Sequence, residues 1–570
     1  MENAQQLSAK FDHDKYKNKK NEMHYDLEAH SLSLRKKANN KVKKFVLPNS
    51  LANDLSYEID LSEIVSKINE HQLYAQFKTS TNETNSLGLL FQMLLIENND
   101  NILKFSLANI KTFLINTDEN SFQVKNLSSE FNDKLVKYLF DLLFKKSNDF
   151  YILSNICFIL NKLSTLINNE QEYYFNILFD NLGNILNLAK SIRQEDPQIK
   201  NLLYLLSSKI FLASDEIISK LEKTFPYYIV QIHQELINLD ESKFVRNMLL
   251  ISTLLNIINN CFFYKIYSDY FFSGSTNDIN EINVENILNF IKKLLNFSYQ
   301  MEILEQELRC VQNFLYLFLE EEKYFNDTNL RKKVQKIINA LELEKKVIPL
   351  IYDGSINQPS LRIVALHILV NSTFICTKKF CEKLINNDIS EQIIKLENYL
   401  IEQIQITNRT KNLYKLLMDL IYNLIENESV EIIDNLSIES NCISLLFKLQ
   451  KIPLYSKENQ SYMVKIFNTL IQSNHKYIQT LLISEGICEW YKEILIDAPN
   501  KEIIEMIITN FLTMAKYSAN LVKDDNNKNN LLLIHLEKIG ILEIANNLKS
   551  RNDFSYEFMG IINEFTHLFK

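Results

Sequence analysis

Apolar residues recur at the helical period almost everywhere after about residue 60 of this 570-residue chain. One run places Leu413, Leu416, Leu417, Leu420 and Leu424 at positions i, i+3, i+4, i+7 and i+11. This spacing is typical of an amphipathic helix with one buried face. Short polar breaks, such as 497–500 and 524–530, separate successive runs. The sequence therefore predicts an all-α protein.

The chain holds only seven Gly and seven Pro, whereas a typical protein has roughly 7% Gly and 5% Pro. Glycine supplies the positive φ angles of tight β turns and the close backbone approach of phosphate-binding loops. Neither G-x-G-x-x-G nor G-K-[ST] occurs in the sequence. A turn-dense β fold and a nucleotide-binding loop are therefore excluded.

An all-helical body of about 480 residues is too large to share one core, so it must divide into domains or repeat. A shorter apolar helix followed by a longer one recurs about every 50 residues, which is near the spacing of armadillo and HEAT repeats. We predict a right-handed superhelical solenoid of about ten armadillo repeats over 81–570, a linker and leading helix over 51–80, and a flexible basic arm over 1–50. The ten long helices are expected at Ile102–Asn116, Asn155–Ser164, Leu202–Leu212, Leu249–Asn260, Leu308–Phe318, Leu361–Ser372, Leu413–Asn427, Tyr462–Asn474, Ile503–Met514 and Tyr556–Phe569.

The formal net charge of −8 is unevenly distributed along the chain. Residues 1–45 hold 11 Lys and Arg against 6 Asp and Glu, which leaves −13 for the remaining residues. The sign of the body disfavours nucleic acid as a partner. A tethered arm reaches effective concentrations in the millimolar range, so a basic arm is able to compete for an acidic groove on its own body.

A mid-helix Asn flanked by apolar residues stands in seven of the ten long helices. These residues are Asn109, Asn161, Asn256, Asn423, Asn468, Asn510 and Asn563. Asn in a helix interior costs helix propensity, so its repetition suggests a use. A row of carboxamides on the inner helices suits the backbone of an extended peptide. The alternative is that these side chains face solvent or cap neighbouring turns in an Asn-rich sequence.

The arm resembles the importin-beta-binding segment of the importin-alpha (karyopherin-alpha) family. Lys15-Tyr16-Lys17-Asn18-Lys19 is similar to the family's [RK]-F-K-N-K start, and Leu34-Arg35-Lys36 and Lys41–Lys44 follow in matching order. In the body, Ser252–Asn260 is similar to the family's W-T-L-S-N-L-C-R-N helix. Two further segments, 478–495 with Glu485-Gly486-Ile487 and 537–569, resemble the last armadillo units of the family. The resemblance extends over nearly the whole chain at low similarity.

The resemblance implies a nuclear import adaptor that shuttles between cytoplasm and nucleus. In this family the solenoid binds the basic localisation signal of a cargo protein and the arm binds importin-beta, while an export factor is a further expected partner on the C-terminal repeats. The implied signal-binding residues are Asn161, Asn256, Asn423, Asn468 and Asn510, together with Asp419. The implied importin-beta contacts are Lys17, Lys19, Lys20, Arg35, Lys36, Lys43 and Lys44.

The sequence departs from the family pattern in the body and in the arm. The family's Trp residues, one turn before each Asn, are replaced by Cys157, Ser252, Asp419, Val464 and Met506. The single Trp490 is expected to pack in a core, and His24-Tyr25-Asp26-Leu27 stands where the family arm is rich in Arg. The alternative function is an armadillo scaffold for protein interactions that has lost conventional signal recognition, with the arm as a flexible basic tail.

No enzyme activity, cofactor, metal or small-molecule substrate is expected. The nine His are dispersed, and neither H-E-x-x-H nor G-x-S-x-G occurs. The seven Cys are scattered, and the one close pair, Cys376 and Cys381, has no neighbouring His, so reduced core thiols are favoured over a zinc site. No run reaches the ~18 apolar residues of a membrane span, and no apolar signal region is found, which predicts a soluble protein of the cytosol or nucleus.

Overall fold

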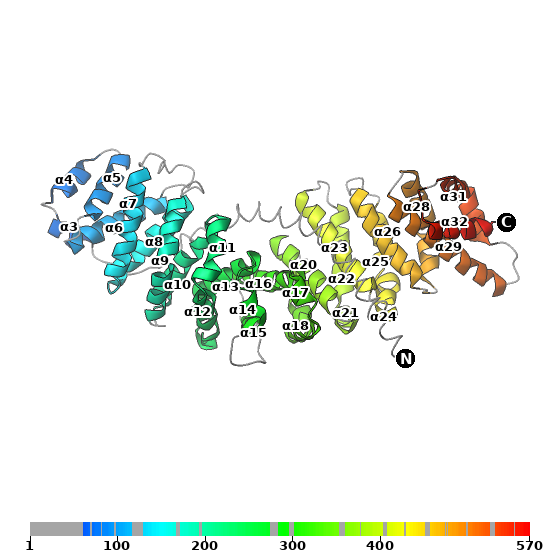
Figure 1. Ribbon diagram of the computed structural model, residues 1–570, viewed down its shortest axis with the longest axis horizontal. Coiled ribbons are helices and arrows are strands. Elements are labelled where there is room, and N and C mark those ends of the chain that lie inside the picture. The colour runs from blue at the N-terminus through cyan, green and yellow to red at the C-terminus, as the bar shows by residue number, and fades with distance from the viewer. Residues whose placement is uncertain are drawn as a thin grey trace. The chain divides into compact units, whose positions relative to one another are not determined.

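The computed structural model describes residues 61–569 apart from 69–70, 81–82, 96–98, 117–128, 167–171, 193–195, 274–282, 296–300, 353–358, 377, 403–406, 427–428, 451–456, 474, 476, 498–499, 525–529 and 552. Every regular element in these described ranges is a helix (Figure 1). The chain divides into two compact units, an N-terminal unit up to Glu322 and a C-terminal unit from Lys323. The predicted arm lies outside the described residues, as do residues 51–60 and 69–70 of the predicted linker and leading helix.

The helices of the N-terminal unit are α3 (Leu61–Ile68), α4 (Gln72–Thr79), α5 (Glu83–Leu94), α6 (Asp100–Asn116), α7 (Ser129–Lys145), α8 (Phe150–Leu166), α9 (Glu172–Ser191), α10 (Pro197–Ser208), η2 (Lys209–Leu212), α11 (Asp215–Thr224), α12 (Tyr227–Ile237), η3 (Glu241–Lys243), α13 (Met248–Phe263), α14 (Ser268–Ser273), α15 (Asn283–Leu295) and α16 (Met301–Glu320). Within this unit α6, α8, α10, α13 and α16 pack in one row, and α7, α9, α12 and α15 pack in a second row.

The short α17 (Glu322–Phe325) lies at the division, and the helices after it are α18 (Thr328–Ala340), α19 (Leu343–Val347), η4 (Ile348–Leu350), α20 (Pro359–Ile375), α21 (Lys378–Ile385), α22 (Ile389–Glu402), α23 (Asn408–Glu426), α24 (Val430–Asp434), the π-helical η5 (Asn435–Glu439), α25 (Cys442–Gln450), α26 (Lys457–Gln472), α27 (Ile478–Ser484), α28 (Ile487–Ile496), α29 (Lys501–Asp524), α30 (Leu531–Lys538), α31 (Ile541–Lys549) and α32 (Tyr556–His567). Here α20, α23, α26, α29 and α32 form the row of long helices, each in contact with the next.

Each of the ten predicted long helices is present, in the order α6, α8, α10 with η2, α13, α16, α20, α23, α26, α29 and α32. We call the two rows that they form the long-helix rows. In both rows each long helix buries apolar side chains against its neighbours, as Leu163, Leu203 and Leu254 do in α8, α10 and α13. The prediction of an all-α repeat solenoid is therefore confirmed.

Five helices of the C-terminal unit begin directly after a residue with positive φ. The five residues are Glu342, Asp388, Asn441, Gly486 and Gly540, with φ of 49, 59, 60, 92 and 86°. The first residue of each following helix is completely buried, namely Leu343, Ile389, Cys442, Ile487 and Ile541. A left-handed residue reverses the chain sharply, so each turn delivers the next helix with its first side chain already in the core. Because Asp and Asn tolerate this conformation better than most residues, a repeat can be built with few glycines.

Trp490 lies in α28, the middle helix of its repeat, and only 7% of its surface is exposed. Its ring meets those of Phe447 and Phe467 edge-on, with centroids 6.4 and 5.5 Å apart. Such edge-to-face pairs add to the burial of apolar area. The expectation that the single Trp packs in a core is confirmed.

Candidate functional site

Three of the five predicted signal-binding Asn residues lie inside the helix stack. Asn161 is completely buried, and its Nδ2 donates to the carbonyl oxygens of Cys157 and Leu202 at 2.8 and 3.1 Å. Leu202 belongs to α10, so this amide joins α8 to the next long helix. A peptide bound by Asn161 in this conformation would have to replace hydrogen bonds that already satisfy the amide nitrogen.

Asn423 and Asn510 have similar internal partners in the C-terminal unit. Asn423 Nδ2 donates to the carbonyl oxygen of Val370 and to Thr373 Oγ1, both at 3.1 Å, and so joins α23 to α20. Asn510 Nδ2 donates to the hydroxyl of Tyr491 at 2.9 Å. The buried carboxamides therefore connect one helix of the stack to another, a role that neither sequence interpretation included.

Other polar side chains make equivalent connections in the N-terminal unit. Thr253 Oγ1 on α13 donates to Asn201 Oδ1 on α10 at 2.7 Å. Ser252, which stands at one of the family's Trp positions, donates through Oγ to Gln306 Oε1 on α16 at 2.5 Å. Each connection satisfies a polar group between two long helices and so fixes their relative register.

Asn256 and Asn468 differ from the other three because they are only half-buried. Asn256 lies on the stripe of α13 that reaches the surface, seven residues from both Leu249 and Phe263. Neither carboxamide makes a hydrogen bond or an ion pair with any residue in the described ranges. These two amides retain the donors and the acceptor that an extended peptide requires.

Asp419 is half-buried on α23 and shares a surface stripe with Tyr422 and Glu426, three and seven residues later. The Tyr422 hydroxyl donates to Glu426 Oε1 at 3.4 Å. This stripe therefore presents carboxylates at the surface of a long helix. The predicted importin-beta contacts, Lys17, Lys19, Lys20, Arg35, Lys36, Lys43 and Lys44, lie outside the described residues.

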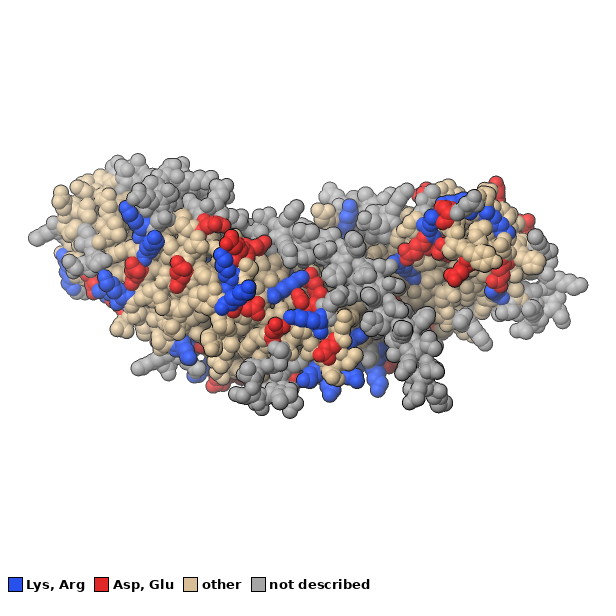
Figure 2. Space-filling view, viewed as in Figure 1, with Lys and Arg blue, Asp and Glu red and all other residues tan. Residues whose placement is uncertain are grey.

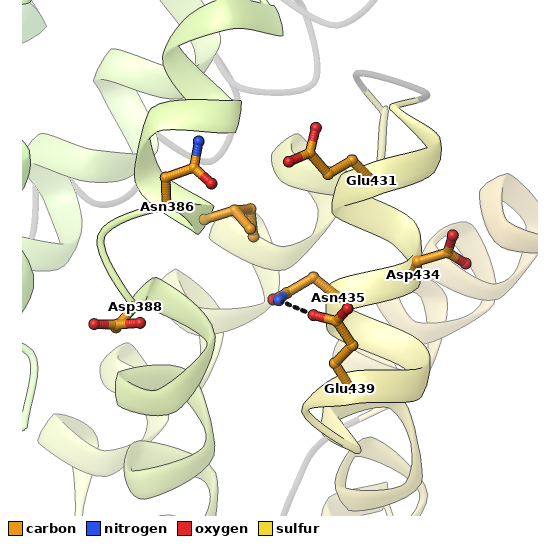
Figure 3. A pocket seen from close by; sticks show the side chains of 7 residues that line it. Asn386, Asp388, Glu431, Asp434, Asn435 and Glu439 are labelled. Carbon is orange, nitrogen blue, oxygen red and sulfur yellow. Dashed lines mark hydrogen bonds between the residues drawn. The ribbon is translucent and has the colours of Figure 1, made fainter.

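A cavity of about 720 Å³ lies in the C-terminal unit between the α21–α22 turn and α24 with η5 (Figure 3). We call it the acidic pocket, because its seven lining residues include four carboxylates and no Lys or Arg. They are Ile385, Asn386, Asp388, Glu431, Asp434, Asn435 and Glu439. Figure 3 shows Asn386 and Asp388 on one side and Glu431, Asn435 and Glu439 on the other.

Local chain geometry positions the carboxylates of the acidic pocket. Asp388 has a φ of 59° and ends the turn before α22. Glu439 is held by Asn435, whose Nδ2 donates to its Oε2 at 2.7 Å across one turn of the π-helical segment. His475 Nε2 lies 2.9 Å from Asp434 Oδ1. The carboxylates come from segments more than 40 residues apart, so sequence reasoning did not group them.

Away from the acidic pocket, charges of both signs alternate on the surface. Figure 2 shows Lys and Arg side chains next to Asp and Glu on the face that it draws. Among the described residues, ion pairs join Lys146 to Asp100 at 2.7 Å and Lys104 to Asp149 at 2.8 Å. Exposed pairs of this kind contribute little to stability.

The described ranges contain no disulfide and no candidate metal site. All seven Cys are buried thiols outside any disulfide, and burial raises the pKa of thiols such as Cys157 and Cys310. These are inert core thiols, as expected. In the residues that the structure describes, no three His, Cys, Asp or Glu side chains come together in a way that would hold a metal ion. None of the described helices is long and apolar enough to cross a membrane.

Comparisons with known proteins support the fold only. A solved structure from work on the phosphorylation switch that controls the interaction between cadherin and beta-catenin matches with a TM-score of 0.51 and 10% identity, over 92% of this chain and 99% of that chain. A crystal structure of importin beta matches with a TM-score of 0.38 and 10% identity, over 92% of this chain and 58% of that one. No protein-family description matches the sequence. No curated protein matches it either.

At 10% identity, the likeness to the first structure bears on architecture and not on ligands. It extends over almost the full length of both chains, and the matched chain is about as long as this one. The chain is therefore an armadillo- or HEAT-type helical solenoid, in agreement with the repeats seen in each unit.

Proposed function

We propose that this chain is a protein-interaction solenoid that works as a nuclear import adaptor. The solenoid holds a Lys-rich segment of a cargo protein, the N-terminal arm binds importin-beta, and the complex moves between cytoplasm and nucleus. The observation that supports this function is a combination of three features. The long helices carry surface amides, the body of the chain is acidic, and the motifs of the basic arm follow the order found in the importin-beta-binding segment of importin-alpha. Stacked helical repeats provide extended binding surfaces of the kind that a peptide segment needs.

In this proposal, Asn256 in the N-terminal unit and Asn468 in the C-terminal unit each contact the backbone of a cargo segment bound to that unit, because both carboxamides are half-exposed and make no hydrogen bond with the described residues. Asp419 receives an ammonium group, and the carboxylates of the acidic pocket provide a second position for basic side chains. Asn161, Asn423 and Asn510 contribute indirectly, since their amides fix the neighbouring helices. The set of proposed ligand contacts is thus narrower than the set that the family resemblance implies.

The arm is tested with the full-length chain carrying Lys17→Glu, Lys19→Glu and Lys20→Glu. We expect this variant to lose retention on immobilised importin-beta, because charge reversal removes the contacts to an acidic receptor. A charge-matched control carries Lys223→Glu, Lys332→Glu and Lys333→Glu, three exposed lysines of the solenoid. Equal retention of the unmodified chain and the arm variant would contradict the adaptor function.

A second candidate is an armadillo scaffold that binds partners without recognising conventional localisation signals. The internal engagement of Asn161, Asn423 and Asn510 and the absence of family Trp residues favour it. Missing indoles remove something like 1 kcal/mol of cation–π energy from each Lys position. A scaffold has no need of the arm, so the arm experiment separates the two candidates.

A further inference from the structure

Arg362 occupies an unusual environment in the first turn of α20. Its Cζ lies 5.0 Å from the ring centroid of Tyr352 and 4.9 Å from that of Tyr399. The two rings are 6.0 Å apart and tilted by 53°. Tyr352 follows η4 and Tyr399 belongs to α22, so three elements of one repeat fix the guanidinium. We call this group the Arg362 clamp.

The guanidinium of Arg362 makes no hydrogen bond or ion pair with the residues that the structure describes. Two other arginines of the chain use their N–H groups on carboxylates. Arg309 Nη2 lies 2.5 Å from Glu305 Oε1, and Arg551 Nη2 lies 2.9 Å from Asp553 Oδ2. The Cζ of Arg362 instead lies within 5.0 Å of the centroids of two aromatic rings, although the body of the chain is rich in carboxylates.

Stacking leaves the edge of a guanidinium available. The five N–H donors of Arg lie in the plane of the group, and a ring contact uses the face and not the edge. The rings also remove rotational freedom, so less entropy is lost when an acceptor binds. Carboxylates and phosphates match this fork because they accept two parallel N–H bonds.

The surroundings of the clamp favour an anion. Arg362 is the fourth residue of α20, a helix of 17 residues, and the N-terminal end of a helix carries a partial positive charge. On α22, Lys395 lies one turn before Tyr399 and is paired with Glu391 at 2.7 Å, so this pair adds no net charge beside the clamp. Both Tyr residues and Arg362 are half-buried, which limits competition from water without closing the site.

We infer that the Arg362 clamp is a binding site for one oxyanion group, a carboxylate or a phosphate, carried by a partner protein. The two tyrosines orient the guanidinium, and its in-plane N–H groups donate to two oxygens of the ligand. This site differs in charge preference from the surfaces proposed for Lys-rich segments. It does not depend on the import function.

The test uses the full-length chain and inorganic phosphate as the probe, observed by the line width of the phosphorus-31 resonance. Arg362→Gln should weaken phosphate binding at least tenfold. Arg362→Lys should weaken it severalfold, because an ammonium keeps the charge but lacks the fork. Tyr399→Leu should weaken it as well, whereas Tyr399→Phe keeps the ring and should bind as the unmodified chain does. Arg409→Gln removes an exposed Arg of α23 and is the charge-matched control.

Acetate competition distinguishes the two anion classes. Displacement of phosphate by acetate at similar concentrations identifies a carboxylate site, and resistance to acetate identifies a phosphate site; either result supports the clamp. Far-ultraviolet circular dichroism of each variant verifies folding. The inference is overturned if Arg362→Gln folds and binds phosphate as tightly as the unmodified chain, or if Arg409→Gln loses as much binding as Arg362→Gln does.

Discussion

At the residue scale, His233 is a histidine that the fold keeps neutral. It is 4% exposed, its Nδ1 lies 2.6 Å from the Tyr270 hydroxyl, and its buried Nε2 has no hydrogen-bond partner among the residues that the structure describes. Burial lowers the pKa of His233 to about 4. Protonation would place an unpaired charge in the interior between α12 and α14.

This shift predicts an acid-sensitive contribution to stability. The unfolded chain protonates His233 near pH 6.5, whereas the folded chain resists protonation until about pH 4. The contribution of neutral His233 to the free energy of unfolding is therefore fully present above pH 6.5. It is lost as the pH falls toward 4, at up to about 1.4 kcal/mol per pH unit. His233→Gln should flatten this slope in urea unfolding between pH 6.5 and 5. Parallel slopes for the two proteins would contradict the assignment.

Backbone strain at the turn residues gives a second prediction at this scale. Glu342 has a φ of 49°, a conformation that costs a side-chain-bearing residue roughly 1–2 kcal/mol. Glu342→Gly relieves that cost but increases the entropy of the unfolded chain, so we expect a net gain of up to about 1 kcal/mol. Gly540→Ala, at a φ of 86°, should lose about as much, although its Cβ would meet no atom within 4 Å. Thermal unfolding of both variants checks the two signs, and a stabilised Gly540→Ala would contradict the explanation.

At the scale of elements, polar side chains between long helices fix the register of the repeats. Asn423 is the clearest case because its amide reaches both the backbone and Thr373 of α20. Asn468 occupies an equivalent position on α26, yet it is only half-buried and makes no hydrogen bond with the residues that the structure describes. The same residue type thus has a structural position in one repeat and a binding position in another.

Alanine substitution should separate these two positions. Asn423→Ala removes two buried hydrogen bonds and should lower the free energy of unfolding by about 1–3 kcal/mol. Asn468→Ala removes no hydrogen bond to a described residue and should change the free energy of unfolding by less than about 0.5 kcal/mol. Urea unfolding of both variants measures the difference. Equal losses would mean that Asn468 also has a structural role.

The long helices were predictable because the apolar period depends only on local sequence, as in the run from Leu413 to Leu424. The orientation of single polar residues was not, since one step along a helix turns the side chain by about 100°. Asn423 is buried for this reason, whereas Tyr422 beside it reaches the surface. The acidic pocket depends on how α21 and α24 stack, and no local pattern reveals that.

At the scale of the whole molecule, a solenoid transmits stability mainly between neighbouring repeats, and the described chain forms two compact units. A destabilising substitution should therefore lower stability mainly in its own repeat and the neighbouring repeats. Leu206 is completely buried in α10, and Leu206→Ala should cost about 2–5 kcal/mol within the N-terminal unit.

Hydrogen exchange measures this locality. Amides of α8, α10 and α13 should exchange faster in Leu206→Ala, while those of α26 and α29 keep their protection. Uniform loss of protection through both units would show that the chain unfolds as one cooperative body, which the repeat description does not allow.

The central claim is that surface amides of the long helices, Asn256 in the N-terminal unit and Asn468 in the C-terminal unit, each bind the backbone of an extended, Lys-rich segment. It is tested most directly by calorimetric titration of the full-length chain with a Lys-rich peptide. The double variant that carries both Asn256→Ala and Asn468→Ala is compared with a control double variant that carries both Asn181→Ala and Asn339→Ala. In the described ranges the control amides, on α9 and α18, donate to carbonyl oxygens of their own helices, and Asn339 Oδ1 also accepts from Lys383 Nζ at 3.4 Å. We expect the first pair to weaken binding by at least ~1 kcal/mol, about fivefold in Kd, and the control to leave it unchanged. Equal affinity of the two double variants would contradict the claim.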